Sequence, residues 1–204
     1  MIVLGLTGSI GMGKTQAALA LRRLGAAVFD ADAEVHRLLA PGGAAVAAVV
    51  SAFPGAAPDG AIDRGALGAL VFGDDIATSR LEAILHPRVS AATSAFLMAA
   101  SARRQKLAVL DVPLLYETGG AAACDAVAVV VAPAFLQAQR VLRRRGMTLA
   151  RFAAIRARQM SDGEKLRRAD FIIHTGLDRR SSLRELQRMV SILTTNQEQA
   201  PTHA

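Results

Sequence analysis

Residues 8–15 read Gly-Ser-Ile-Gly-Met-Gly-Lys-Thr, directly after the apolar run Ile2–Leu6 and before a helix-forming segment, Gln16–Leu24. This is the G-x-x-x-x-G-K-[ST] pattern of a phosphate-binding loop, and it stands in the strand–loop–helix context that the pattern requires. The glycines let successive backbone N–H groups point into one concavity, and the N-terminus of the following helix adds partial positive charge. The sequence therefore predicts a nucleoside triphosphate site. The structural alternative is a glycine-rich turn that binds no ligand.

Two side chains at the end of this loop have separate tasks. The Lys14 ammonium can reach the β- and γ-phosphates of a bound nucleotide, and the Thr15 hydroxyl is placed to hold Mg²⁺. We therefore expect the nucleotide to bind together with magnesium.

Composition limits the classes of protein that this chain can belong to. Its 204 residues, 52% of them hydrophobic, fit one α/β domain with insertions and exclude a disordered chain. The longest uncharged stretch, Leu38–Pro58, is rich in Ala, Gly and Pro and predicts short helices and turns rather than a membrane span. The single cysteine, Cys124, rules out an intramolecular disulfide and suits a reducing cytosol, so we expect a cytoplasmic protein.

The charge balance indicates an anionic partner. Net charge is +7, from 24 basic and 17 acidic residues, which is typical of proteins that bind nucleic acid or phosphorylated small molecules. Only 4% of the residues are aromatic and none is Trp, so base-stacking surfaces are poorly supplied. We interpret the charge as favouring polyphosphate substrates, with arginines on solvated helices as the alternative, and expect no nucleic-acid or membrane partner and a monomer.

Five short apolar runs are typical of buried parallel strands. They are Ile2–Leu6, Ala26–Phe29, Leu107–Leu110, Ala126–Val131 and Phe171–Ile173. Helix-forming segments separate these runs. The pattern predicts an α/β fold of the P-loop NTPase type, with a doubly wound five-stranded parallel sheet.

The spacing between the runs predicts two insertions. The gap from Phe29 to Leu107 is far longer than one crossover helix needs, so we expect an inserted helical subdomain there. Its expected helices are Ala33–Leu39, Ala44–Phe53, Arg64–Val71, Ile76–Leu85 and Pro87–Arg104. The second insertion, Pro133–Arg168, is rich in arginine and predicts a helical lid. We divide a single domain into a core (1–32, 105–132 and 169–193), the inserted subdomain (33–104), the lid (133–168) and a polar, frayed tail (194–204).

Three carboxylates follow predicted strands, where ligands of open parallel sheets bind. A phosphotransferase needs a carboxylate that accepts the proton of the attacking hydroxyl, and we assign this role to Asp32. Asp111 and Asp30 are candidates for contacting Mg²⁺ through water. Each of these two has a structural alternative, which is helix capping for Asp30 and backbone hydrogen bonding for Asp111.

Arginines are concentrated in the predicted lid. Arg140, Arg143, Arg144 and Arg145 are expected on one helix, and Arg156 and Arg158 on the next. Guanidinium groups on a mobile segment can neutralise charge on a transferring phosphoryl group. Arg140 and Arg144 share a helix face at i,i+4, whereas Arg143 and Arg145 should be largely solvated. The alternative for each of them is a solvated basic face.

Two other classes of site lack support. His86 stands alone before Pro87, with no second His, Cys or paired acid at metal-ligand spacing, so we predict no zinc site. No G-x-S-x-G sequence occurs, so serine-hydrolase chemistry is not indicated.

Taken in order, several segments resemble the dephospho-coenzyme A kinase family over most of the chain. They are Leu6-Thr-Gly-Ser-Ile-Gly-Met-Gly-Lys-Thr15, Asp30-Ala-Asp32, Asp59-Gly-Ala-Ile-Asp-Arg64, Leu81-Glu-Ala-Ile-Leu-His-Pro87, Asp111-Val-Pro-Leu-Leu-Tyr-Glu117, Arg158-Gln-Met160, and Glu164-Lys165 followed by Ala169-Asp170. Many families share the phosphate-binding loop. The ordered combination with Asp-Ala-Asp, His-Pro and Val-Pro-Leu-Leu-Tyr-Glu is much more specific.

The resemblance implies that ATP phosphorylates the 3′-hydroxyl of the dephospho-coenzyme A ribose, giving coenzyme A and ADP. The implied nucleotide contacts are Gly8, Gly11, Met12, Gly13, Lys14, Thr15 and Gln16. The implied catalytic residues are Lys14, Asp32, Arg140 and Arg144, with Arg144 as the lid arginine. The implied acceptor contacts are His86, Leu114, Leu115, Glu117 and Arg158, and the insertion would be the acceptor-binding subdomain.

Two positions depart from the family pattern. Gln16 stands where a second Ser or Thr is common, which removes a side-chain contact to phosphate but not the backbone contact. The segment His174-Thr-Gly176 stands where the family often has Asn-x-Gly near the adenine.

Three other functions are alternatives. A kinase for nucleoside monophosphate or shikimate shares the core but not the His-Pro and Pro-Leu-Leu-Tyr-Glu context. A regulatory GTPase or nucleotide-gated binding module is a second alternative. The guanine-reading sequence N-K-x-D is absent, which argues against GTP specificity, and a binding module would bind ATP without acceptor-dependent ADP release. A nucleic-acid binder would retain DNA or RNA with a steep dependence on salt.

Overall fold

The computed structural model describes residues 1–58, 60–176 and 178–198. The chain divides into two compact units, of which one is Met1–Phe29 with Ala99–Ala204 and the other is Asp30–Met98. Asp59, at the start of one segment quoted above, lies outside the described residues.

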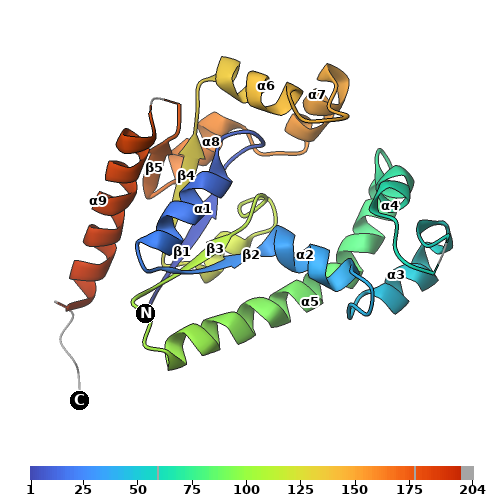
Figure 1. Ribbon diagram of the computed structural model, residues 1–204, viewed down its shortest axis with the longest axis horizontal. Helices are drawn as coiled ribbons and strands as arrows, with labels where there is room; N and C mark the ends of the chain where they lie inside the picture. Colours follow the sequence, from blue (N-terminus) through green and yellow to red (C-terminus); the bar gives the residue numbers. More distant parts are fainter. Residues whose placement is uncertain (59, 177, 199–204) are drawn as a thin grey trace. The chain divides into compact units, whose positions relative to one another are not determined.

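The first unit is built on one five-stranded parallel sheet in the order β2-β3-β1-β4-β5 (Figure 1). The strands are β1 (Ile2–Thr7), β2 (Ala27–Asp30), β3 (Leu107–Asp111), β4 (Ala126–Val131) and β5 (Phe171–His174). The five predicted strands are confirmed. The central strand β1 pairs with β3 and β4, in a register that places Leu6 opposite both Asp111 and Ala128.

Side chains of β4 alternate between two hydrophobic layers, because successive residues of a strand point to opposite faces of a sheet. Ala128 and Val130 pack in the layer that α1 (Lys14–Arg23) and α9 (Arg179–Glu198) complete with Leu21 and Leu186. Val127 and Val129 pack on the other face with Leu115. Both faces of the sheet are therefore covered, as a buried parallel sheet requires.

The remaining helices of the first unit lie between β3 and β5. They are a short 3₁₀ helix (Gly120–Ala123), α6 (Ala134–Leu142), α7 (Leu149–Ala157) and α8 (Asp162–Arg168). Side chains stabilise two of the starts, because Thr148 Oγ1 accepts from Arg151 N and Ser161 Oγ accepts from Glu164 N. We call residues 133–168 the lid segment.

The arrangement of arginines in the lid segment differs from the prediction. Helix α6 ends at Leu142 with Arg143 as its C-cap, and the chain turns at Gly146, whose φ is 74°. Arg144 and Arg145 therefore lie beyond the helix, and the expected i,i+4 face shared by Arg140 and Arg144 does not form.

The second unit is helical. It contains α2 (Ala31–Leu39), α3 (Val46–Ala52), a 3₁₀ turn (Pro54–Ala56), α4 (Arg64–Val71) and most of α5 (Asp75–Ala102). Its core gathers Leu38, Val49, Phe53, Leu67 and Leu85. The predicted helices of this region are confirmed with one exception at α5.

Helix α5 continues through Pro87, although the sequence predicts two helices separated before this proline. A proline inside a helix removes one backbone hydrogen bond and opens the adjacent turn. Here the Arg88 guanidinium donates to Ile84 O (2.6 Å) and to Ala44 O (3.2 Å), which supplies donors beside the opened turn. These bonds join the residue after the proline to the preceding turn of α5 and to Ala44.

The C-terminal helix is longer than expected. Helix α9 continues to Glu198, so the predicted start of a frayed tail at residue 194 is corrected, and residues 199–204 lie outside the described part of the chain. Leu193 packs against the core and Thr194 Oγ1 donates to Val190 O (2.9 Å). Among the described residues, no helix has the length and apolar character needed to span a membrane.

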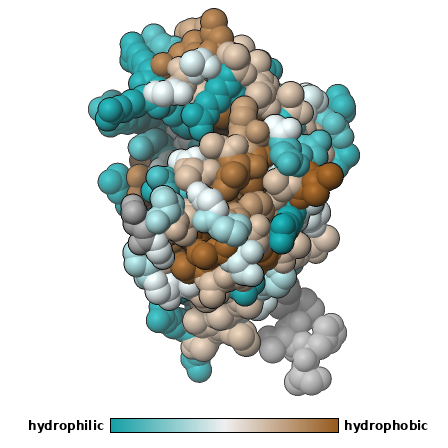
Figure 2. Space-filling view, turned by 90° about the vertical axis from the view of Figure 1, so that its right-hand side faces the viewer, coloured by the Kyte–Doolittle hydropathy of each residue, from teal (hydrophilic) through white to brown (hydrophobic). Residues whose placement is uncertain are grey.

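Figure 2 shows hydrophobic residues in separate patches between hydrophilic ones on one face of the molecule. Exposed large hydrophobic residues include Phe72 and Ile76 in the second unit and Phe135 and Leu149 in the lid segment. Scattered apolar exposure of this kind is normal for folded proteins.

Candidate active site

The phosphate-binding loop joins the end of β1 to the start of α1. Gly11 and Gly13 have φ angles of 79° and 93°, in the left-handed region that favours glycine. A Cβ on Gly13 would also lie 2.7 Å from Thr175 Oγ1, and one on Gly11 would lie 2.5 Å from a methyl group of Val141. Both the backbone conformation and the close packing of the loop therefore require glycine at these two positions.

The N-terminus of α1 is open to an anion. Gly13 is its N-cap and provides no capping side chain, and its first turn contains no acidic residue. The first backbone bonds run from Gln16 N and Ala17 N to Gly13 O, at 3.0 and 3.3 Å. The N–H groups before them have no partner inside the helix, and the helix dipole adds partial positive charge at the same place. The Thr15 side chain is exposed at this helix end.

Lys14 forms an ion pair with the carboxylate that ends the neighbouring strand. Its Nζ lies 2.5 Å from Asp111 Oδ1, and the two side chains are 15% and 4% exposed. Burial costs an unpaired charge several kcal/mol, so the pair stabilises both groups. A phosphate group bound in the loop would offer the same ammonium a second anionic partner.

Four side chains of the lid segment hold the outer part of the loop. Two of them donate to backbone oxygens of the loop: Gln137 Nε2 to Ile10 O (2.8 Å) and Arg140 Nη1 to Gly11 O (3.4 Å). The other two accept from the loop: Gln159 Oε1 from Ile10 N (3.1 Å) and Asp162 Oδ1 from Ser9 Oγ (2.5 Å). Sequence reasoning gave a role only to Arg140 among them. Gln137 is 1% exposed, and a buried amide needs an internal partner, but the sequence does not say which one.

Arg140 also joins the loop to the residue that follows β5. Its Nη2 donates to Thr175 O (2.8 Å), and Thr175 Oγ1 in turn donates to Met12 O. Thr175 N donates to Val131 O (2.9 Å), which fixes this residue at the end of β4. The guanidinium of Arg140 is thus engaged with backbone oxygens on both sides.

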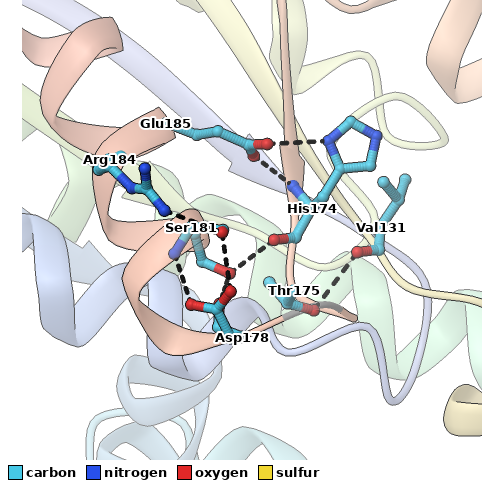
Figure 3. Close-up of polar contacts among 8 residues, drawn as sticks. Val131, His174, Thr175, Asp178, Ser181, Arg184 and Glu185 are labelled. Carbon is cyan, nitrogen blue, oxygen red and sulfur yellow. Dashed lines mark hydrogen bonds and ion pairs between the residues drawn. The ribbon is translucent and has the colours of Figure 1, made fainter.

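The start of α9 holds the end of β5 (Figure 3). His174 N donates to Glu185 Oε2 (2.7 Å), His174 Nδ1 lies 3.2 Å from Glu185 Oε1, and Ser182 Oγ donates to His174 O (2.6 Å). Asp178 caps α9 by accepting from Ser181 N and Ser181 Oγ, and these bonds lower the pKa of Asp178. His174, which departs from the expected pattern, is therefore anchored through its backbone and its ring.

Comparison with known proteins identifies the family. A model of the dephospho-CoA kinase family matches residues 2–178. The chain belongs to the dephospho-CoA kinase family. The dephospho-CoA kinase of Paramagnetospirillum magneticum is 63% identical over 165 residues, which are 81% of this chain and 78% of that protein.

A further relative and a solved structure are also similar to this chain. The dephospho-CoA kinase of Rhodospirillum rubrum is 57% identical over 187 residues, 91% of this chain and 89% of that protein. A crystal structure of a Thermus thermophilus protein is 31% identical, covers 98% of each chain and has a TM-score of 0.81. The family and the fold expected from the sequence are confirmed.

The other lid arginines predicted from the family are exposed. Arg144 lies in the turn after α6, and Arg158 is the C-cap of α7. Arg156 lies over the Phe152 ring, with its guanidinium carbon 5.9 Å from the ring centroid. Arg140 binds the loop, and the Arg144 side chain is exposed to solvent.

The segment after β3 that the family pattern assigns to the acceptor is largely part of the protein interior. Leu115 is 1% exposed and packs under the sheet, and Leu114 is half-buried. Glu117 Oε1 lies 2.9 Å from Lys165 Nζ and accepts from Met160 N (2.8 Å). The structure therefore places the Glu117 carboxylate and the Leu115 side chain in internal contacts.

Three predicted site residues belong to the second unit. Asp30 ends β2 and caps α2, because its Oδ1 accepts from Ala33 N (2.9 Å). This is the structural alternative that the sequence left open. Asp32 is exposed in the first turn of α2, and His86 is exposed on α5.

Within the described residues, no three or more His, Cys, Asp or Glu side chains gather as a metal cluster. Magnesium in nucleotide sites is commonly held by one or two protein groups together with phosphate and water. The exposed Thr15 hydroxyl and the Asp111 carboxylate are donors of the type that Mg²⁺ prefers, so the residues present fit this ion.

Proposed function

We propose that this chain transfers the γ-phosphoryl group of ATP to the ribose 3′-hydroxyl of dephospho-CoA, giving CoA and ADP in the last step of CoA biosynthesis. The observation that carries the proposal is the glycine loop with Lys14 at the N-terminus of α1, in a chain that is 63% identical to a dephospho-CoA kinase. Phosphoryl transfer asks a protein mainly for positioning and for neutralisation of charge.

The phosphate-binding loop supplies positioning and charge neutralisation for the nucleotide. Backbone N–H groups of residues 11–16 and the α1 dipole bind the phosphates. Gly8 lets the chain pass close to β4, because a Cβ there would lie 2.6 Å from Val130 O. The Lys14 ammonium neutralises the β- and γ-phosphates after exchanging part of its contact with Asp111. The ion pair with Asp111 holds the Lys14 ammonium at the loop.

Magnesium would be held by Thr15 directly and by Asp111 through water. When bound, the ion neutralises phosphate charge in the transition state. Asp30 Oδ1 accepts a hydrogen bond from Ala33 N and so caps α2. A contact of this carboxylate with the water shell of the ion would be additional to the capping bond.

Asp32 accepts the proton of the ribose 3′-hydroxyl and orients it toward the γ-phosphorus. Its position in the first turn of α2, two residues after the end of β2, supports this role. Arg144, exposed on the turn after α6, neutralises the transferring group when the lid segment closes, while Arg140 keeps the loop and Thr175 together.

His86, Leu114 and Arg158 are the remaining candidates for the acceptor side, and the second unit is the acceptor-binding region. The acceptor is itself a pyrophosphate, so exposed arginines and histidines suit it. On composition alone, we place the protein in the cytoplasm as a monomer that does not bind nucleic acid.

The deciding experiment measures ADP release with one acceptor at a time. Purified protein with ATP and magnesium should turn over dephospho-CoA and leave UMP and shikimate unphosphorylated, and the product should carry the new phosphate on the ribose 3′-oxygen. Turnover with UMP or shikimate but not with dephospho-CoA would refute the proposal. ATP binding without acceptor-dependent ADP release would instead indicate a nucleotide-binding module.

A further inference from the structure

A buried ion pair lies beneath the connection between α7 and α8. Lys165, on α8, is 0% exposed, and its Nζ lies 2.9 Å from Oε1 of Glu117. Burying an ammonium and a carboxylate costs several kcal/mol for each ion. Apolar residues of similar volume at the same positions often make a folded protein equally stable or more stable. A pair kept at this cost indicates a task beyond filling the interior.

The Glu117 carboxylate has a second contact that apolar residues cannot replace. Its Oε1 accepts a hydrogen bond from Met160 N (2.8 Å). Burial raises the pKa of Glu117, but the Lys165 ammonium and the backbone N–H donors outweigh it, and the pKa lies below its ordinary value. The carboxylate is therefore ionised at neutral pH and remains a strong acceptor for Met160 N.

Met160 N is fixed next to the two side chains that hold the phosphate-binding loop from this side. Gln159 Oε1 accepts from Ile10 N (3.1 Å), and Asp162 Oδ1 accepts from Ser9 Oγ (2.5 Å). A continuous series of contacts thus runs from Lys165 through the carboxylate and the 159–162 segment to the loop. All of these residues belong to the first unit.

We propose that Glu117 is a positioning residue for the triphosphate site: oriented by Lys165, it fixes the 159–162 segment so that Gln159 and Asp162 hold Ile10 and Ser9 in the nucleotide-binding conformation. The contacts of its carboxylate are with Lys165 Nζ and Met160 N. The inference rests on the proposed function only in that the loop binds ATP, and it concerns nucleotide binding before any acceptor is present.

Two double variants separate positioning from stability. Glu117→Leu/Lys165→Met removes both charges and the acceptor of Met160 N, and Glu117→Gln/Lys165→Met removes both charges but keeps an amide oxygen for that N–H. ATP affinity is measured by calorimetry without acceptor, and stability by thermal unfolding. We expect the Leu/Met variant to bind ATP about tenfold or more weakly and the Gln/Met variant to stay within about threefold of the wild type, whatever their unfolding temperatures. Equal ATP affinity in the two variants, or affinity that follows the unfolding temperature, overturns the proposal.

The route through Gln159 has its own test. Gln159→Leu alone should weaken ATP binding. When this substitution is added to Glu117→Leu/Lys165→Met, the further loss of ATP binding free energy should be less than half of the loss that Gln159→Leu causes in the wild type. Fully additive losses would refute this route. Tyr116→Phe is the matched control, because it removes a hydrogen bond to Arg168 O from the same segment but leaves Met160 N untouched. It should leave ATP affinity unchanged.

Failure of the two proposals would look different. Wild-type protein that binds ATP but does not phosphorylate dephospho-CoA would refute the proposed function, and the affinity comparison between the double variants would still decide the role of Glu117.

Discussion

The Lys14 ammonium and the Asp111 carboxylate lie 2.5 Å apart, one at the start of α1 and the other at the end of β3. Parallel pairing of β1 and β3 aligns Leu6 with Asp111, so the strand register brings the loop and the carboxylate to the same edge of the sheet. The lysine that the triphosphate needs is thus also the partner of a buried acid. Removing Lys14 should therefore affect both the activity and the stability of the protein.

Lys14→Ala should abolish turnover, because no other ammonium replaces it at the loop, and should also destabilise the protein by about 1–3 kcal/mol, because Asp111 keeps a buried, less compensated charge. Steady-state ADP release and chemical unfolding measure the two effects. Adding Asp111→Asn to Lys14→Ala should restore part of the stability and none of the activity. Lys106→Ala, at the opposite end of β3, is the control for loss of one positive charge and should retain turnover.

Asp32→Asn should lower kcat about 10²- to 10⁴-fold with little loss of ATP affinity, because a general base acts in the transition state and not in nucleotide binding. Glu82→Gln, an exposed acid of the same unit, is the charge-matched control and should behave like the wild type. Near-normal kcat in the Asp32 variant would remove this residue from catalysis.

The lowered pKa of Glu117 predicts the direction of one part of the acid dependence of stability. Because the folded-state pKa is below the ordinary value of 4.5, the stabilisation is present above that value and is lost as pH falls through the folded-state pKa. Unfolding followed from pH 6 to pH 3 should show a smaller loss for Glu117→Leu/Lys165→Met than for the wild type. Identical pH profiles would show that this carboxylate does not contribute.

Cys124 should be nearly inert while the protein is folded. Burial raises the pKa of its thiol to about 11, so at pH 7.5 fewer than about one thiol in a thousand is ionised, and the thiolate is the reactive form. A thiol reagent in excess should modify the native protein at least about tenfold more slowly than the protein unfolded in denaturant. Equal rates in the two states would contradict the assigned burial.

Sequence periodicity predicted the sheet well because each strand contains a short apolar run, and β1, β3 and β4 are largely buried. It failed at Pro87, which predicts a break. Helix α5 continues through this proline, and Arg88 beside it donates to Ile84 O and Ala44 O, contacts that depend on the fold. The arginine spacing predicted one helix that includes Arg144 and Arg145, whereas α6 ends at Leu142 and the chain turns at Gly146.

The candidate site was predictable to the extent that it is local in sequence. The loop, Lys14 and Thr15 follow from one motif, and Asp32 and Asp111 from their places after strands. The groups that hold the loop from the lid segment are more than 120 residues away in the chain, as for Gln137 and Ile10. Their partners depend on the fold, so the sequence indicated a role for only one of them, Arg140.

Substitution of alanine for glycine should have opposite effects at two positions. Gly13→Ala places a side chain at a φ of 93° and a Cβ 2.7 Å from Thr175 Oγ1, so it should distort the loop and weaken ATP binding by at least about tenfold. Gly68→Ala, inside α4, meets open space and should raise stability by about 0.5–1 kcal/mol while leaving ATP affinity unchanged. Calorimetry with ATP and thermal unfolding of both variants check the contrast. Wild-type ATP affinity in Gly13→Ala would show that the loop does not need this backbone conformation to bind the triphosphate.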